Sequence, residues 1–154
     1  MKYLLKISAW NIGLLISSIL IAELIFGGWF GAPQLWSLSI VRDINWQYNV
    51  PGTYQRDTLV HYTRDKWGLR GDFGSPSNVE IVAIGGSTTD EGRVSNEETW
   101  PEVLEQCLKA NAVEADIANA GIGGQSSRGH ILNFHKWFKF IPRFKPKVAL
   151  VYLG

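Results

Sequence analysis

Cysteine and histidine are scarce in this sequence. Its 154 residues include one cysteine, Cys107, which excludes an intrachain disulfide and leaves the redox compartment open. The three histidines form no His-x-x-x-His motif, and no Cys-x-x-Cys is present, so we expect no metal site. Cys107 shares a helical stripe with Val103, Leu104 and Leu108. We therefore expect its thiol to pack in a core rather than to act as a nucleophile.

An excess of charge of either sign is also missing. The chain carries 15 lysines and arginines against 14 aspartates and glutamates, a formal net charge of +1. A nucleic-acid-binding domain is usually strongly basic, so we expect no nucleic-acid partner. A local basic patch near the end of the chain is typical of a solvated face, although it would also suit anionic lipid close to a membrane. The patch consists of Lys136, Lys139, Arg143, Lys145 and Lys147.

A long apolar run occupies the amino terminus. Residues 7–22 are nearly all apolar, and residues 24–30 extend the run after Glu23. This length approaches the roughly 20 residues that cross a bilayer. A helix apolar on every face would find little interior in a 154-residue protein. We therefore expect residues 1–30 to be a transmembrane anchor.

Basic residues give the expected orientation of this anchor. Lys2 and Lys6 precede the run, and the next basic residue is Arg42, which predicts a cytoplasmic amino terminus and an extracytoplasmic domain in the cell (inner) membrane. The alternative is a cleaved signal peptide, but a small-x-small cleavage site is missing where it would be needed. We expect residues 31–78 to form an extracytoplasmic linker with short strands, one of them at residues 58–63.

A candidate nucleophile follows the next apolar segment. The β-rich run from Val79 to Ile84 ends in Gly85 and Gly86, and Ser87 comes directly after these glycines. Ser87 would thus lie at the carboxyl end of a buried parallel strand, where open α/β sheets bind ligands. These residues alone are equally compatible with an ordinary glycine turn capped by hydroxyl groups.

Capping signals predict a helix after this turn. Thr99 and Glu102 have the spacing of a capping box, and Pro101 falls in the first turn, so a helix should run to about Ala112. Asp90 and Glu91, in the loop between, are interpreted as solvated carboxylates. The helix residues expected to face the sheet are Trp100, Val103, Leu104, Cys107 and Leu108.

Two further strands and a helix complete the pattern. Residues 115–120 form a strand that enters the glycine-rich turn at residues 121–127, and residues 147–153 form a third buried strand. A helix over residues 127–140 should bury Ile131, Phe134, Trp137 or Phe138, and Ile141. Right-handed crossovers make this β-α-β-α-β order half of a doubly wound parallel sheet. The nearby His130 and His135 are interpreted as packed or solvated side chains.

The order and spacing of four blocks resemble the SGNH (GDSL-type) hydrolase family. Residues 84–89, Ile-Gly-Gly-Ser-Thr-Thr, look like its nucleophile block, and residues 98–105 look like the helix after it. Residues 119–127, Asn-Ala-Gly-Ile-Gly-Gly-Gln-Ser-Ser, look like its second block. Residues 146–154 look like the strand entering its Gly-x-Asn-Asp block. The resemblance covers residues 79–154.

This resemblance implies a fold and a set of site residues. The fold would be a three-layer α/β/α, flavodoxin-like parallel sheet, of which the chain holds the first half. Ser87 matches the nucleophile, and its backbone N-H and that of Gly124, with Gly121 as the fallback, match the oxyanion hole. Gly154 matches the glycine of Gly-x-Asn-Asp, whose Asn lies beyond the chain. Gly86 departs from the motif, since the founding sequence has Asp there.

The resemblance also implies an activity. We expect a serine esterase, an acyl-ester hydrolase or O-acyltransferase, that needs no cofactor and acts outside the cytoplasmic membrane. Envelope glycan or lipid esters are the expected substrates, by analogy from fold and location. The family's Asp-x-x-His lies beyond the chain, so residues 1–154 alone should show little or no turnover. The alternative is a non-catalytic, membrane-tethered binding or scaffold module on the same fold. A phosphate-binding loop ranks third, because a P-loop lysine is missing.

Overall fold

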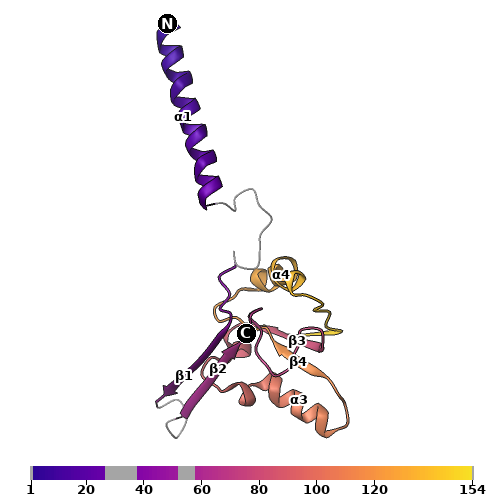
Figure 1. The fold of residues 1–154 in the computed structure, drawn as a ribbon. Coiled ribbons are helices and arrows are strands. Elements are labelled where there is room, and N and C mark those ends of the chain that lie inside the picture. The colour runs from indigo at the N-terminus through magenta and orange to yellow at the C-terminus, as the bar shows by residue number, and fades with distance from the viewer. Residues whose placement is uncertain (1, 27–37, 52–57, 154) are drawn as a thin grey trace. The chain divides into compact units, whose positions relative to one another are not determined.

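The structure, a computed structural model, describes residues 2–26, 38–51 and 58–153 (Figure 1). The chain forms two units, Met1–Ser37 and Leu38–Gly154. The first unit contains helix α1 (Lys2–Phe26), and the second contains a hairpin and an α/β sheet.

Helix α1 is apolar along nearly its whole length. The 22 residues Leu5–Phe26 have a mean hydropathy of 1.9 and none is buried. Among the described residues, this is the one helix long and apolar enough to cross a membrane. The helix predicted for the amino terminus is therefore confirmed as a candidate membrane span.

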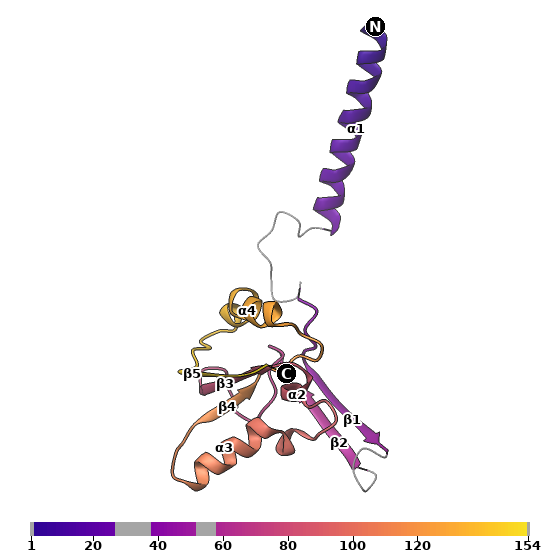
Figure 2. The same ribbon diagram turned by 180° about the vertical axis from the view of Figure 1, so that it is seen from behind.

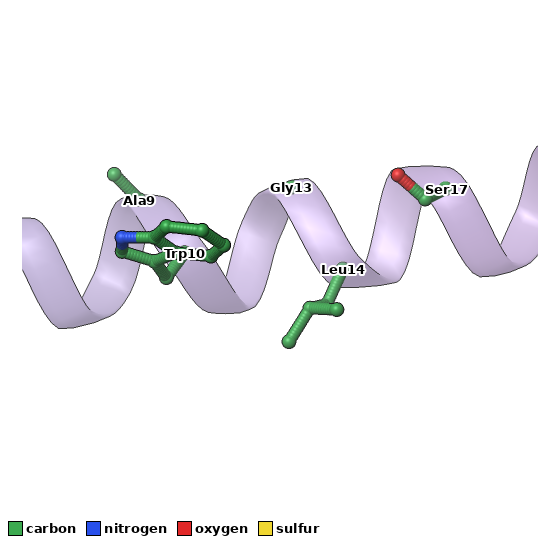
Figure 3. A pocket seen from close by; sticks show the side chains of 5 residues that line it. All are labelled: Ala9, Trp10, Gly13, Leu14 and Ser17. Atoms are coloured by element: carbon green, nitrogen blue, oxygen red, sulfur yellow. The ribbon is translucent and has the colours of Figure 1, made fainter.

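A surface hollow of about 380 Å³ lies along α1 beside Gly13, which has no side chain to fill it. Figure 3 shows its lining, which consists of Ala9, Trp10, Gly13, Leu14 and Ser17. None of these residues is an acid, a base or a metal ligand. This hollow therefore offers no titratable group for catalysis.

The second unit begins with an antiparallel hairpin. Strand β1 (Ile44–Val50) pairs with β2 (Thr58–Arg64), so the strand expected at residues 58–63 is confirmed. Val50, Val60 and Tyr62 form a small buried core in this hairpin. The pairing places Arg64 opposite Ile44, at the end of β2 that leads into the rest of the unit.

The main sheet has three parallel strands. Strand β3 (Val79–Gly85) lies between β4 (Asp116–Asn119) and β5 (Val148–Tyr152), in the order β4-β3-β5. Val82, Ala83 and Ile84 of β3 are fully buried, as expected for a central strand of β-branched and small apolar residues. The predicted α/β fold with a parallel sheet is confirmed, and the strand order is that of the first three strands of flavodoxin-like folds.

Helices cover both faces of this sheet. Helix α3 (Trp100–Ala110) connects β3 to β4, and α4 (Ser127–Lys136) precedes β5. Because β4 and β5 flank β3 on opposite sides, right-handed crossovers place α3 and α4 on opposite faces, as Figures 1 and 2 show. Shorter helices complete the unit, namely α2 (Ser87–Asp90), η2 (Asn96–Glu98) and η3 (Phe138–Phe140).

The start of α3 differs from the prediction in its chemistry. Thr99 is the N-cap residue, but its side chain caps no helix N-H, and the hydroxyl donates to the Asn96 carbonyl at 2.9 Å. The Glu91 carboxylate accepts the Trp100 N-H at 2.6 Å instead. The predicted capping box is therefore wrong, because the Thr99 hydroxyl and the Thr99 N-H both donate to the Asn96 carbonyl and neither takes part in the box.

The buried face of α3 also differs from the prediction. Glu105 is 2% exposed and accepts the Ile117 N-H of β4 at 2.6 Å, while Lys109 pairs with the same carboxylate at 2.5 Å. This hydrogen bond turns Glu105 toward the sheet and leaves Val103 and Cys107 exposed. The expectation that Cys107 packs in a core is therefore wrong.

Helix α4 and strand β5 expose side chains that were expected to be buried. The helix ends at Lys136, and Trp137, Phe138 and Ile141 enter the core as predicted, but Ile131 and Phe134 are exposed. His130 and Asn133 are the buried residues of α4. Strand β5 pairs on one side, with β3, and is largely exposed, so its predicted burial is wrong for the part of the chain that the structure describes.

Candidate active site

Glycine makes possible the sharp turn that presents Ser87. The carboxyl end of β3 passes through Gly85 into Gly86, the N-cap of α2. A Cβ atom at Gly85 would lie 2.1 Å from Thr89 Oγ1 and 2.6 Å from the Tyr152 carbonyl oxygen. Both distances are far inside van der Waals contact, so no other residue fits there. Ser87 thus emerges directly from the central strand.

The Ser87 side chain is free to react. It is exposed, and its hydroxyl makes no hydrogen bond to any residue that the structure describes. The backbone around it is held, because the Gly86 carbonyl accepts the N-H groups of Thr89 at 3.1 Å and Asp90 at 2.9 Å. The Ser87 carbonyl accepts the Glu91 N-H at 2.8 Å. A fixed backbone with an unengaged hydroxyl is the arrangement that a nucleophile requires.

A second glycine turn lies beside the first. The Ile122 N-H donates to the Gly85 carbonyl at 3.0 Å, and the Gln125 N-H donates back to the Ile122 carbonyl at 3.2 Å. Gly124 has a φ of +75°, the third-position conformation of a type II turn, which favours glycine. Its N-H has no acceptor among the described residues. It is therefore available to an anion, as the oxyanion role requires.

Gly121 has a different function from the one considered for it. Its N-H donates to Asn119 Oδ1 at 2.9 Å and cannot also bind an oxyanion. A Cβ atom at this position would lie 2.2 Å from the Asp90 backbone nitrogen. Gly121 therefore allows the second turn to pack against α2. Gly154, the remaining residue predicted for the oxyanion hole, lies outside the described residues.

Two buried arginines hold these turns together. Arg64 and Arg70 are 5% and 1% exposed. Arg64 Nη2 lies 2.7 Å from Asp90 Oδ1 and 2.5 Å from the Gly121 carbonyl oxygen, so one guanidinium joins α2 to the second turn. Arg70 donates to the Asp90 carbonyl, and its Nη1 lies 3.8 Å from Asp90 Oδ1. Burial lowers the pKa of Arg70, while the neighbouring Tyr62 and Asp90 raise it.

The interpretation of Asp90 and Glu91 as solvated carboxylates is therefore wrong. Asp90 is the counter-ion of both arginines and also accepts the Tyr62 hydroxyl at 2.8 Å. Glu91 caps α3 through the Trp100 N-H. Neither is placed as a general acid or base for Ser87, because both are engaged in holding the loop.

None of the three histidines is hydrogen-bonded to Ser87. His130 is buried, and its Nδ1 is 2.8 Å from Gln125 Oε1, while His135 is exposed on α4. His61 is exposed on β2, with its Nδ1 3.5 Å from Gln47 Nε2. Among the described residues no histidine bonds to the Ser87 hydroxyl.

An open apolar surface hollow lies at the carboxyl end of β3. It measures about 360 Å³, and Trp100 and Tyr152 line it. Tyr152 is the register partner of Gly85, so the hollow opens next to the end of β3. The indole Nε1 of Trp100 is buried without a described hydrogen-bond partner.

Glu91 gives the site a testable dependence on pH. Burial raises the pKa of its carboxyl group, while the Trp100 N-H and Arg70 lower it. A raised folded-state pKa contributes stability below the ordinary glutamate pKa, and this is lost as the pH rises through the raised value. Between about pH 4 and pH 7, the wild type should therefore lose thermal stability relative to Glu91→Gln. Exposed Glu97→Gln is the control, and its thermal stability should change with pH as that of the wild type does. If the thermal stabilities of the wild type and Glu91→Gln changed equally with pH, the raised pKa of Glu91 would be contradicted.

These features define an α/β protein with an unengaged serine in a glycine turn at the carboxyl end of a parallel sheet. No family model matches the chain, and no curated protein matches it. Among solved structures, the chain is similar to AlinE4, an SGNH-hydrolase family esterase, with 30% sequence identity and a TM-score of 0.44. Two mutants of AlinE4 match with 30% and 28% identity and the same TM-score. Each alignment covers 48% of this chain and 39% of the esterase chain.

Proposed function

We propose that this chain carries the nucleophile of an SGNH-type serine esterase or O-acyltransferase that acts outside the cytoplasmic membrane. The observation that supports this most is the exposed, unengaged Ser87 hydroxyl at the carboxyl end of β3, together with a neighbouring turn in which the Gly124 N-H has no acceptor among the described residues. The residues of both turns are those that resemble the family's first two blocks. The activity is proposed for the full-length protein, since the chain spans 39% of the esterase chains that it matches.

The proposed reaction is acyl transfer through Ser87. Its Oγ attacks the ester carbonyl carbon as its proton passes to a histidine outside the described residues, and the alcohol leaves with a proton. The N-H groups of Ser87 and Gly124 stabilise the charge on the carbonyl oxygen. Water or an acceptor hydroxyl then releases the acyl group. The hollow at Trp100 and Tyr152 is proposed to hold an apolar part of the ester.

A fluorophosphonate probe tests the nucleophile directly. The full-length protein should be labelled on Ser87, because the serine oxygen displaces fluoride from phosphorus and forms a stable phosphonyl ester. The Ser87→Ala variant should not be labelled. Equal labelling of both proteins would contradict the assignment. A folded wild-type protein with no labelling at all would favour the non-catalytic, membrane-tethered module instead.

We further propose that α1 anchors the protein in the inner membrane with its amino terminus in the cytoplasm. Its apolar length and the lysines at positions 2 and 6 support this orientation. After alkaline carbonate extraction, the intact protein should stay in the membrane pellet, and its release into the supernatant would contradict the anchor. In intact spheroplasts, a membrane-impermeant maleimide should label the exposed Cys107, whereas Cys107→Ser should stay unlabelled.

A further inference from the structure

Charge is divided unevenly along the chain although its total is near zero. Residues 117–154 contain six lysines and arginines and no aspartate or glutamate. Residues 1–116 therefore hold nine basic and 14 acidic residues. The formal net charge is +6 for the last 38 residues and −5 for the rest. The cationic segment is Arg128, Lys136, Lys139, Arg143, Lys145 and Lys147, all exposed.

Helix α4, within this segment, buries polar side chains and exposes apolar ones. Its buried residues, His130 and Asn133, are polar and are bonded to Gln125. Its large apolar side chains are exposed to a large extent: Ile131 is 62% exposed, Leu132 39% and Phe134 47%, although the Phe134 ring also packs edge-on against the buried Phe138. A helix that packs only against its own domain shows the opposite pattern.

Basic and apolar side chains share the outward side of α4. Arg128, Ile131 and Leu132 have the i, i+3, i+4 spacing of a single helix face. Lys136 and Lys139 follow at the end of the helix and in η3. Exposed apolar groups flanked by cations, with no acid nearby in sequence, match the interface of an anionic bilayer.

We propose that the outward side of α4 docks on an anionic lipid surface, with Ile131 and Phe134 in the interfacial layer and Lys136 and Lys139 on the headgroups. This proposal rests on the membrane anchoring proposed for α1, but not on the esterase activity. Eleven residues separate Phe26 from Leu38, and at most about 40 Å of extended chain can join them. Such a tether raises the effective concentration of the domain at the bilayer, so a weak contact suffices.

Spin labels in lipid nanodiscs test this contact in the full-length protein. One protein carries the label at Ile131→Cys in a Cys107→Ser background, and a control carries it at the native Cys107. Cys107 is exposed on α3, on the opposite face of the sheet. Discs contain phosphatidylcholine alone or mixed with phosphatidylglycerol. Retention of protein on carbonate-washed discs checks the α1 anchor separately.

The expected result is lipid-dependent protection of position 131 alone. In anionic discs its label should collide several-fold less with a water-soluble nickel chelate and more with oxygen, while the Cys107 label should not change. Lys136→Glu with Lys139→Glu should abolish the protection, whereas Lys66→Glu with Arg93→Glu, the same charge change elsewhere, should preserve it. Equal accessibility in both lipids would overturn the proposal. Equal protection of position 131 in both lipids would indicate a protein contact instead.

Discussion

Replacing Ser87 with alanine is expected to lower kcat/KM for a short aryl ester by about 10⁴-fold or more in the full-length protein, because the variant loses the oxygen proposed to form the acyl intermediate. The backbone of the turn should survive, since its hydrogen bonds join the main-chain carbonyls of Gly86 and Ser87 to the N-H groups of residues 89–91. Initial-rate kinetics on p-nitrophenyl acetate, with circular dichroism to confirm folding, measure the effect.

Two matched variants give this experiment its specificity. Thr88 is the exposed neighbouring hydroxyl, and Thr88→Ala should retain most of the activity. Gly124→Ala should cost about 10- to 1,000-fold, because one oxyanion donor is displaced. No atom lies within 4 Å of its added Cβ, so the loss is expected from strain at a φ of +75° rather than from crowding. If Thr88→Ala were inactive and Ser87→Ala active, the nucleophile would be Thr88 and the assignment of Ser87 would be wrong.

Asp90→Asn is expected to destabilise the domain by about 3–5 kcal/mol, the usual cost of removing one partner from a buried ion pair. Asp90 is the carboxylate that pairs with both Arg64 and Arg70, and its side chain is 17% exposed. Without it, two buried guanidinium groups would face each other uncompensated. The urea midpoint of the detergent-solubilised protein measures the change in the free energy of unfolding.

Exposed Asp72 offers a matched control for this substitution. Asp72→Asn removes the same charge at the surface and should change the free energy of unfolding by less than about 0.5 kcal/mol. Similar urea midpoints for the wild type and Asp90→Asn would show that the arginines are compensated by their backbone carbonyl acceptors alone. The proposed role of Asp90 as the obligatory counter-ion would then be wrong.

The strands and their order could be predicted because their signals are local. Each signal lies within a few residues: the β-branched run before Gly85, the glycine turns and the apolar spacing of the helices. The right-handed crossover rule then predicts how the strands and helices are arranged. The rotation of each helix could not be predicted in the same way. Glu105 turns toward β4 through a hydrogen bond to a residue 12 positions away, and this exposes Cys107.

In the candidate site, too, the residues with local signals could be predicted and the long-range contacts could not. Ser87 and Gly124 could be found because glycines mark turns at the ends of strands. Asp90 was misread because its partners, Arg64 and Arg70, lie 26 and 20 residues earlier, in a segment expected to be a linker. Neither a hydrophobic period nor a local motif can predict an ion pair between two segments that are distant in the sequence. The one sequence signal was the presence of arginines within an otherwise strand-like and glycine-rich stretch.

Arg64 lies on the hairpin and Arg70 in the loop after it, and their bonds to Asp90 change where the domain boundary should be drawn. Every motif of the proposed chemistry lies after Val79, so a domain boundary drawn from the motifs alone would discard the hairpin and the loop after it. Such a truncation would leave Asp90 without its guanidinium partners and the Gly121 carbonyl without its donor. The hairpin is thus part of the folding unit that shapes the nucleophile turn, and a soluble version of the domain should start before Ile44.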